Sequence, residues 1–120
     1  MLMKHICLVC ILLLGSLSAV HAHSSTKMTI PEAGAILNKT PDAVVLTFIE
    51  PARVTKVLLT HKTDASSQSV DLKIPTKEFV TTIKLATDMV GAGDYQIIWR
   101  ALGHDGHPVN GAFSFKVTGE

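Results

Sequence analysis

Two groups of residues in this chain carry side chains well suited to binding a metal ion. The first is His23, which becomes the first residue of the chain if a protease cuts after Ala22. A free terminal amine and the Nδ1 of its own imidazole can close a six-membered chelate ring on one ion. The second group is His104-Asp105-Gly106-His107-Pro108, where two imidazoles and a carboxylate crowd a short segment. We predict that the two groups meet around a single ion.

The donor atoms in these two groups favour Cu(II) over other ions. Nitrogen and oxygen donors in a tetragonal arrangement suit Cu(II), which also heads the affinity order of the first-row divalent ions. Asp105 and His107 are two residues apart, so on an extended segment they would share one face. Gly106 lets the backbone bend between them. The sequence therefore predicts one Cu(II) per mature chain, held by His23, Asp105 and His107.

Each of these residues also has an ordinary structural interpretation. Asp-Gly is among the commonest turn dipeptides, so the loop taken alone is more often an ordinary solvated turn than a metal site. His104 is either a partner that supports a metal ligand or a plain loop residue. Glu50 is either an exposed carboxylate at a strand end or an acceptor for a hydrogen bond from a ligand. His61 has no metal-type neighbour in sequence and is expected to be solvated on a hairpin.

Residues 1–22 have the three parts of a secretory signal peptide: a basic start, a short apolar run and small residues at the cut. The apolar run at 6–14 is shorter than the roughly 20 residues that span a membrane. Val20 and Ala22 fit the small positions before the cut. We therefore predict a signal peptide at 1–22, a mature domain at 23–120 and no stable membrane anchor after processing. A cut after Ser18 and a retained anchor are the alternatives.

Cysteine and charge narrow the class of protein further. Cys7 and Cys10 both lie in the predicted signal, so the mature domain has no thiolate for Cu(I) or structural zinc. Lipid attachment at Cys10 is not expected, because Val9 before it is not small. The formal net charge is +1, with both signs interspersed. This pattern indicates neither a nucleic-acid partner nor a basic membrane-binding stretch.

The elements that must position the metal-binding groups are short strands. Apolar and polar residues alternate in several runs separated by turn residues, which is typical of an all-β sandwich or barrel. The runs lie at 44–48, 54–60, 70–74, 82–85, 95–101 and 113–117, with a polar hairpin at 61–69 and a loop at 102–111. We predict one domain, an immunoglobulin-like Greek-key β-sandwich of about seven strands.

Two aromatic residues are assigned to the core of that sandwich. Trp99 and Tyr95 alternate with polar neighbours at strand spacing, which favours core packing for both. Tyr95 also follows Gly91-Ala92-Gly93-Asp94, a corner that enters a late strand. In such folds a tyrosine at this corner bonds through its hydroxyl to the backbone.

Three segments match the pattern of a known family in order and spacing. They are Ala22-His23 with Pro31-Glu32-Ala33-Gly34, the run Leu-Thr-Phe-Ile-Glu-Pro at 46–51, and Gly-Asp-Tyr-Gln-Ile-Ile-Trp-Arg at 93–100 leading to 105–109 and 111–115. Through these segments the chain resembles the CopC copper-resistance proteins of the bacterial periplasm. The resemblance spans nearly the whole mature chain, which makes it more specific than any one motif.

The resemblance implies a Greek-key sandwich that binds Cu(II) through His23, by amine and imidazole, with Asp105 and His107. It places Glu50 where the family keeps a carboxylate close to the metal. Some members also hold Cu(I) in a methionine-rich loop. This chain departs from that pattern, because its mature part has only Met28 and Met89.

These observations favour a non-enzymatic function. We predict a periplasmic Cu(II) carrier or buffer in copper resistance or homeostasis, whose partners are the copper ion and a membrane copper transporter or outer-membrane copper protein. One alternative is a copper-dependent oxidative enzyme of the histidine-brace type, and another is a structural sandwich domain without metal.

Overall fold

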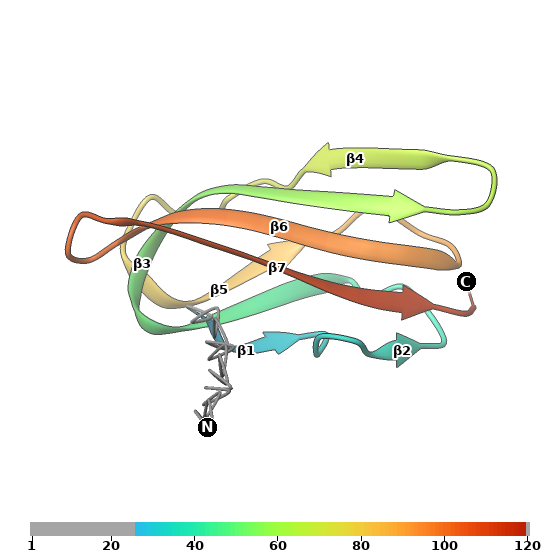
Figure 1. Cartoon of the computed structure of the whole chain (residues 1–120), viewed down its shortest axis with the longest axis horizontal. Helices are drawn as coiled ribbons and strands as arrows, with labels where there is room; N and C mark the ends of the chain where they lie inside the picture. The colour runs from blue at the N-terminus through green and yellow to red at the C-terminus, as the bar shows by residue number, and fades with distance from the viewer. Residues whose placement is uncertain (1–25, 120) are drawn as a thin grey trace, which may run out of the picture.

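The computed structural model describes residues 26–119, and over that range it contains seven strands and no helix. The strands are β1 (Thr26–Ile30), β2 (Ile36–Leu37), β3 (Ala43–Lys62), β4 (Ser67–Asp71), β5 (Val80–Ala86), β6 (Gly93–Gly103) and β7 (Pro108–Val117). Figure 1 shows them folded over one another as two layers. The predicted all-β sandwich is confirmed, and so is the number of strands. The predicted signal peptide lies outside the described residues.

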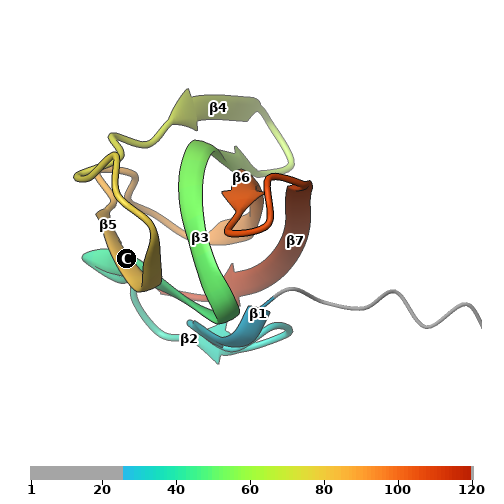
Figure 2. The same ribbon diagram turned by 90° about the vertical axis from the view of Figure 1, so that its left-hand side faces the viewer.

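The long strand β3 joins the two layers. Its first half pairs with β1 and with β5, and its second half pairs with β6 and with β4. Ala52 is the crossing point, because it pairs with both Val80 of β5 and Gly103 of β6. Beyond β6 the sheet continues through β7 to β2, which runs parallel to β7. Figure 2 shows β3 curving across the end of the molecule between the layers.

The sequence had suggested two separate strands, at 44–48 and 54–60, and this was wrong. The two runs belong to one 20-residue strand that continues through Pro51. Proline lacks the N–H that a ladder needs. It is tolerated here because the pairing with β5 is interrupted between Thr47 and Ala52. The proline thus lies in the bend of β3 and breaks no ladder hydrogen bond to β5.

The core lies between the layers and is built from the inward residues of the alternating runs. Trp99 and Tyr95 are each only 1% exposed, which confirms their predicted core role. The Trp99 ring packs edge-on against Phe48 at a centroid distance of 5.3 Å, joining β6 to β3. Other fully buried members are Val44, Leu46, Val57, Leu59, Leu85, Ile97 and Val117. Because inward and outward residues alternate along each strand, burial follows the predicted period of two.

The corner before β6 has the predicted hydrogen bond. The Tyr95 hydroxyl donates to the Gly91 carbonyl at 2.8 Å. His61 is half-buried and not fully solvated, because its ring stacks on Tyr95 at 4.2 Å between centroids. His61 Nε2 also lies 2.8 Å from the Ala92 carbonyl oxygen. His61 points toward the core face of β3 and covers the end of the sandwich at this corner.

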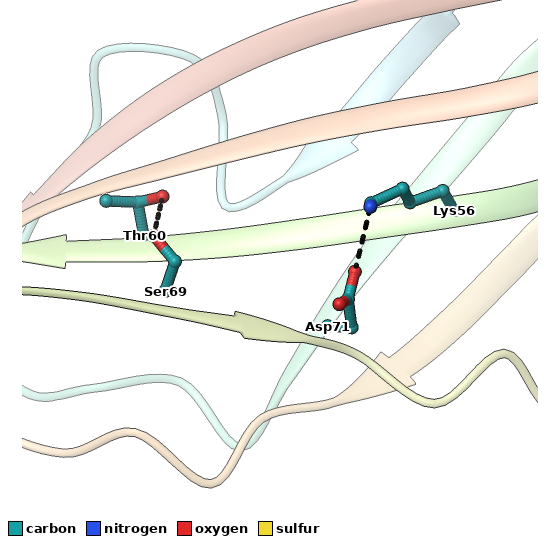
Figure 3. Close-up of polar contacts among 4 residues, drawn as sticks. All are labelled: Lys56, Thr60, Ser69 and Asp71. Carbon is teal, nitrogen blue, oxygen red and sulfur yellow. Dashed lines mark hydrogen bonds and ion pairs between the residues drawn. The ribbon is translucent and has the colours of Figure 1, made fainter.

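The strand β4 begins and ends three residues earlier than the run predicted at 70–74, and it lies on the outside of the fold. It ends at Asp71, and Leu72 is buried beyond the end of the strand. Two polar pairs join its exposed face to β3 (Figure 3). Thr60 and Ser69 approach at 2.9 Å between hydroxyl oxygens, and Lys56 Nζ lies 3.6 Å from Asp71 Oδ1. Exposed pairs of this kind add little stability, so β4 depends mainly on its backbone ladder.

Two further details differ from the sequence prediction or add to it. The loop expected at 102–111 is only a turn at 104–107, because β6 extends to Gly103 and β7 starts at Pro108. The strands β1 and β2 had not been predicted, since one is short with exposed apolar residues and the other has only two residues. In residues 26–119 no helix is long and apolar enough to cross a membrane.

Candidate metal centre

The turn between β6 and β7 brings Asp105 and His107 together. Asp105 Oδ2 lies 3.1 Å from His107 Nδ1, and Asp105 Oδ1 accepts the backbone N–H of His107 at 3.0 Å. The turn closes through the Gly103 N–H, which donates to the His107 carbonyl at 2.7 Å. Both side chains are largely exposed, at 71% and 80% respectively. An oxygen and a nitrogen donor are therefore adjacent on a rigid turn and open to solvent.

The geometry of this pair differs from the extended segment that the spacing had suggested. Gly106 has φ of +86°, a left-handed conformation that glycine adopts without strain. Its N–H donates to the Gly103 carbonyl at 3.0 Å. The Asp105 side chain then bonds to the backbone two residues on, as aspartate commonly does in turns. A glycine turn, and not the alternation of a strand, thus places the two side chains on one side.

His107 lowers the pKa of the Asp105 carboxyl. The largest cause is the hydrogen bond from the His107 backbone N–H, followed by the one from its side chain. Both contacts favour the ionised carboxylate. Asp105 is therefore an anionic oxygen donor over the whole neutral and mildly acidic range.

Strand pairing brings the start of β1 and Glu50 toward the same end of the molecule. Thr26 pairs with Phe48, and β1 is antiparallel to β3. From Ile30 back to Thr26, the partners of β1 on β3 run from Val45 forward to Phe48. The start of β1 is therefore directed toward Glu50 and toward Ala52, which pairs with Gly103. In Figure 2 the β6–β7 turn, the bend of β3 and the beginning of β1 all lie at the end that faces the viewer. Glu50 is exposed, and within residues 26–119 it forms no ion pair.

His104 lies in the same turn but makes a different contact. Its ring meets Phe79 edge-on at a centroid distance of 5.9 Å and an interplanar angle of 79°. The Arg53 guanidinium carbon lies 4.6 Å from the centre of the same Phe79 ring. Phe79 and Arg53 were not among the predicted site residues. No motif marks either residue, and only the pairing of three strands at Ala52 brings them beside His104.

The predicted ligands are brought together only in part within the described residues. Asp105 and His107 are in contact, whereas His104 is not grouped with them as a third donor. Across residues 26–119 no cluster of three or more histidine, cysteine, aspartate or glutamate side chains is placed to hold a metal ion. The remaining predicted ligand, His23, lies outside the described residues. Within the described residues the turn therefore brings together two of the three predicted ligands.

Comparison with solved structures agrees with the observed architecture. PcoC, described as a methionine-rich copper resistance protein from Escherichia coli, has a TM-score of 0.62 and 27% identity, covering 81% of this chain and all of that one. CopC from Methylosinus trichosporium OB3b also has a TM-score of 0.62, with 23% identity over 79% of this chain and 93% of that one. At that lower identity the second likeness shows the fold alone.

Sequence comparison identifies the family. Copper resistance protein C of Escherichia coli is 28% identical over 114 residues, which cover 88% of this chain and 90% of that protein. The family model of the CopC domain matches residues 26–118, a span that includes every strand of the fold and the β6–β7 turn. The chain therefore belongs to the CopC family.

Proposed function

We propose that this protein binds one Cu(II) ion per mature chain and acts as a copper carrier or buffer in copper resistance or homeostasis. The relatives named as copper resistance proteins support a copper function. The observation that carries the proposal is the contact between Asp105 Oδ2 and His107 Nδ1 at 3.1 Å, which holds the carboxylate and the imidazole together on the β6–β7 turn. Two ligand side chains that are already held side by side lower the cost of assembling the site.

His23 completes the proposed ligand set once residues 1–22 are removed. Its amine and imidazole add two nitrogen donors to the His107 imidazole and the Asp105 carboxylate, which is the mixed nitrogen and oxygen set that Cu(II) favours. The direction of β1 supports this assignment, because the strand leads back toward Glu50 and the crossing point of β3. Glu50 is then available as an acceptor for a hydrogen bond from a ligand. His104 is not needed for this set.

Removal of a signal peptide also implies export, and we propose the periplasm as the location of the mature protein. A carrier needs no catalytic group. Its copper would pass to or from a membrane copper transporter or an outer-membrane copper protein. The turn that carries Asp105 and His107 lies at one end of the sandwich, so such a partner would approach that end.

The test compares two forms of the chain that differ by one residue. Protein beginning at His23 is titrated with Cu(II) by calorimetry beside protein beginning at Ala22, in which the His23 amine is an amide. We expect one tight site in the first form and a loss of at least two orders of magnitude in affinity in the second. Equal affinity in both forms would remove the amine from the ligand set.

A second arm tests the turn separately from the terminus. His107→Ala in the chain that begins at His23 is expected to weaken Cu(II) binding, while Lys116→Ala, on an exposed position of β7 away from the turn, serves as the matched control. The intact mass of the exported protein then shows whether natural processing exposes His23. A different natural first residue would contradict the proposed site even if the engineered chain bound copper.

A further inference from the structure

The cluster of Arg53, Phe79 and His104 borders the proposed metal site without belonging to its ligand set. Phe79 precedes Val80, Arg53 follows Ala52, and His104 follows Gly103. Val80, Ala52 and Gly103 lie side by side, because Ala52 pairs with both of the others. The backbone therefore fixes all three side chains at the same end of the fold. Their association is a consequence of the crossing between the two layers.

The contacts inside the cluster restrain His104. The centre of the Phe79 ring lies 4.6 Å from the guanidinium carbon of Arg53 and 5.9 Å from the centre of the His104 ring. Phe79 remains 36% exposed, so it is not there to fill the core. A cation on an aromatic ring and an edge-on ring pair are each favourable contacts. Arg53 in turn lies over the Phe79 ring and restrains it.

The position of His104 in sequence makes this restraint significant. His104 is adjacent to Asp105 and three residues from His107, in the same exposed turn. An imidazole there is a strong donor for Cu(II), and a fourth nitrogen would compete with the Asp105 carboxylate for the metal. Yet the three side chains do not form a metal-binding group in the described part of the chain. His104 instead faces Phe79.

We propose that Phe79 is a positioning residue that keeps the His104 imidazole away from the copper ion. This inference rests on the proposed function of the site. Phe79, supported by Arg53, limits the imidazole donors to those of His23 and His107 and reserves one position for Asp105. The weaker carboxylate donor then makes the ion easier to release, which suits a protein that must pass its copper on.

The first experiment uses metal-free protein and does not depend on copper. Nuclear Overhauser contacts between the Phe79 and His104 rings are expected in the chain that begins at His23. Phe79→Tyr keeps the ring and should keep these contacts. If the wild-type rings show no such contacts, the restraint on His104 is absent and the proposal is overturned.

The second experiment counts the imidazoles bound to Cu(II) by electron spin-echo envelope modulation. Wild type and Phe79→Tyr are expected to show two imidazoles, and Phe79→Ala is expected to show three. Adding His104→Ala to Phe79→Ala should return the count to two. Circular dichroism of Phe79→Ala checks that the sheet is retained, and Phe79→Leu, which keeps apolar bulk without the ring, provides a second release variant.

The outcomes separate the two proposals. A wild-type chain that binds no Cu(II) contradicts the proposed function, while the ring contacts in metal-free protein still test the positioning of His104. A wild-type chain that already shows an imidazole dependent on His104 overturns the role of Phe79. So does a count that stays at two in both Phe79→Ala and Phe79→Leu.

Discussion

At the scale of single residues, Asp105 has two interactions with His107 that both favour its charged form. The pKa of its carboxyl is lowered first by the His107 backbone N–H and second by the imidazole. Because the carboxylate form is stabilised in the folded turn, these contacts are present above the ordinary titration range of the group. They are lost as pH falls through the lowered pKa of the folded protein.

The first prediction follows from the order of those causes. In metal-free protein, carboxyl carbon shifts should show Asp105 titrating below the ordinary range of an aspartate side chain. His107→Ala should raise the Asp105 pKa only partly, since the backbone hydrogen bond remains. The reference is the aspartate of an unstructured peptide measured under the same conditions. Full return of the Asp105 pKa to the peptide value would show that the side chain, and not the backbone, is the main cause.

A second residue-scale prediction concerns Tyr95, whose hydroxyl donates to Gly91. Tyr95→Phe keeps the ring stack but leaves the carbonyl without this donor. We expect the free energy of unfolding to fall by about 1–2 kcal/mol, measured by urea denaturation. The control Ser114→Ala removes an exposed hydroxyl of β7 and should change the free energy of unfolding by less than about 0.5 kcal/mol. Similar values for both variants would show that the corner hydrogen bond contributes nothing particular.

At the scale of elements, the close approach of β7 to the Trp99 ring makes Gly111 hard to replace. A Cβ at Gly111 would lie 2.7 Å from Trp99 Cζ2, and Trp99 is fully buried against Phe48. The ring has no room to move away. Gly111→Ala should therefore lower the free energy of unfolding by about 1–3 kcal/mol, the usual cost of overpacking.

The control for this third prediction is Asn110, which precedes Gly111 and lies on the outer face of the same strand. Asn110 is exposed, so Asn110→Ala should stay within about 0.5 kcal/mol of wild type. Thermal or urea unfolding of the two variants side by side measures the difference. A Gly111→Ala protein as stable as Asn110→Ala would mean that Trp99 has space that the structure does not show.

At the scale of the whole molecule, the proposed site links the segment before the first strand to the turn between the last two strands. An ion held by His23 and by the β6–β7 turn would tie β1 to the opposite layer. A ligand that binds only the folded form stabilises it by mass action, by about 2.7 kcal/mol at a free concentration 100 times Kd. The fourth prediction is that Cu(II) raises the Tm of the chain that begins at His23.

The form that begins at Ala22 is the control for this whole-molecule effect and should show little change in Tm at the same free Cu(II). The increase should shrink as pH falls, because protons compete with the metal for the amine and both imidazoles. Differential scanning calorimetry at neutral and mildly acidic pH measures both comparisons. An equal increase in the two forms at neutral pH would place the copper somewhere other than the mature terminus.

The sequence by itself determined the class of fold and the composition of the core. Alternation with a period of two is a local property, so Tyr95, Trp99 and their inward neighbours could be assigned to the core before any pairing was known. The corner hydrogen bond of Tyr95 was predictable from the glycine-rich corner at 91–94 that precedes it. The turn at 104–107 was also visible in the sequence from its Asp-Gly pair, and so were the donor side chains of Asp105 and His107.

Only the tertiary structure decided which strands pair and what the turn places beside itself. The amine of the proposed ligand set depends on a covalent event, the cut before His23. The stacking of His61 on Tyr95 and the contact of Phe79 with His104 each join residues that are distant in sequence. Such contacts depend on register and on the crossing at Ala52, and one sequence carries no local signal for either. The continuity of β3 through Pro51 depends on the same pairing, because the ladder to β5 is interrupted there.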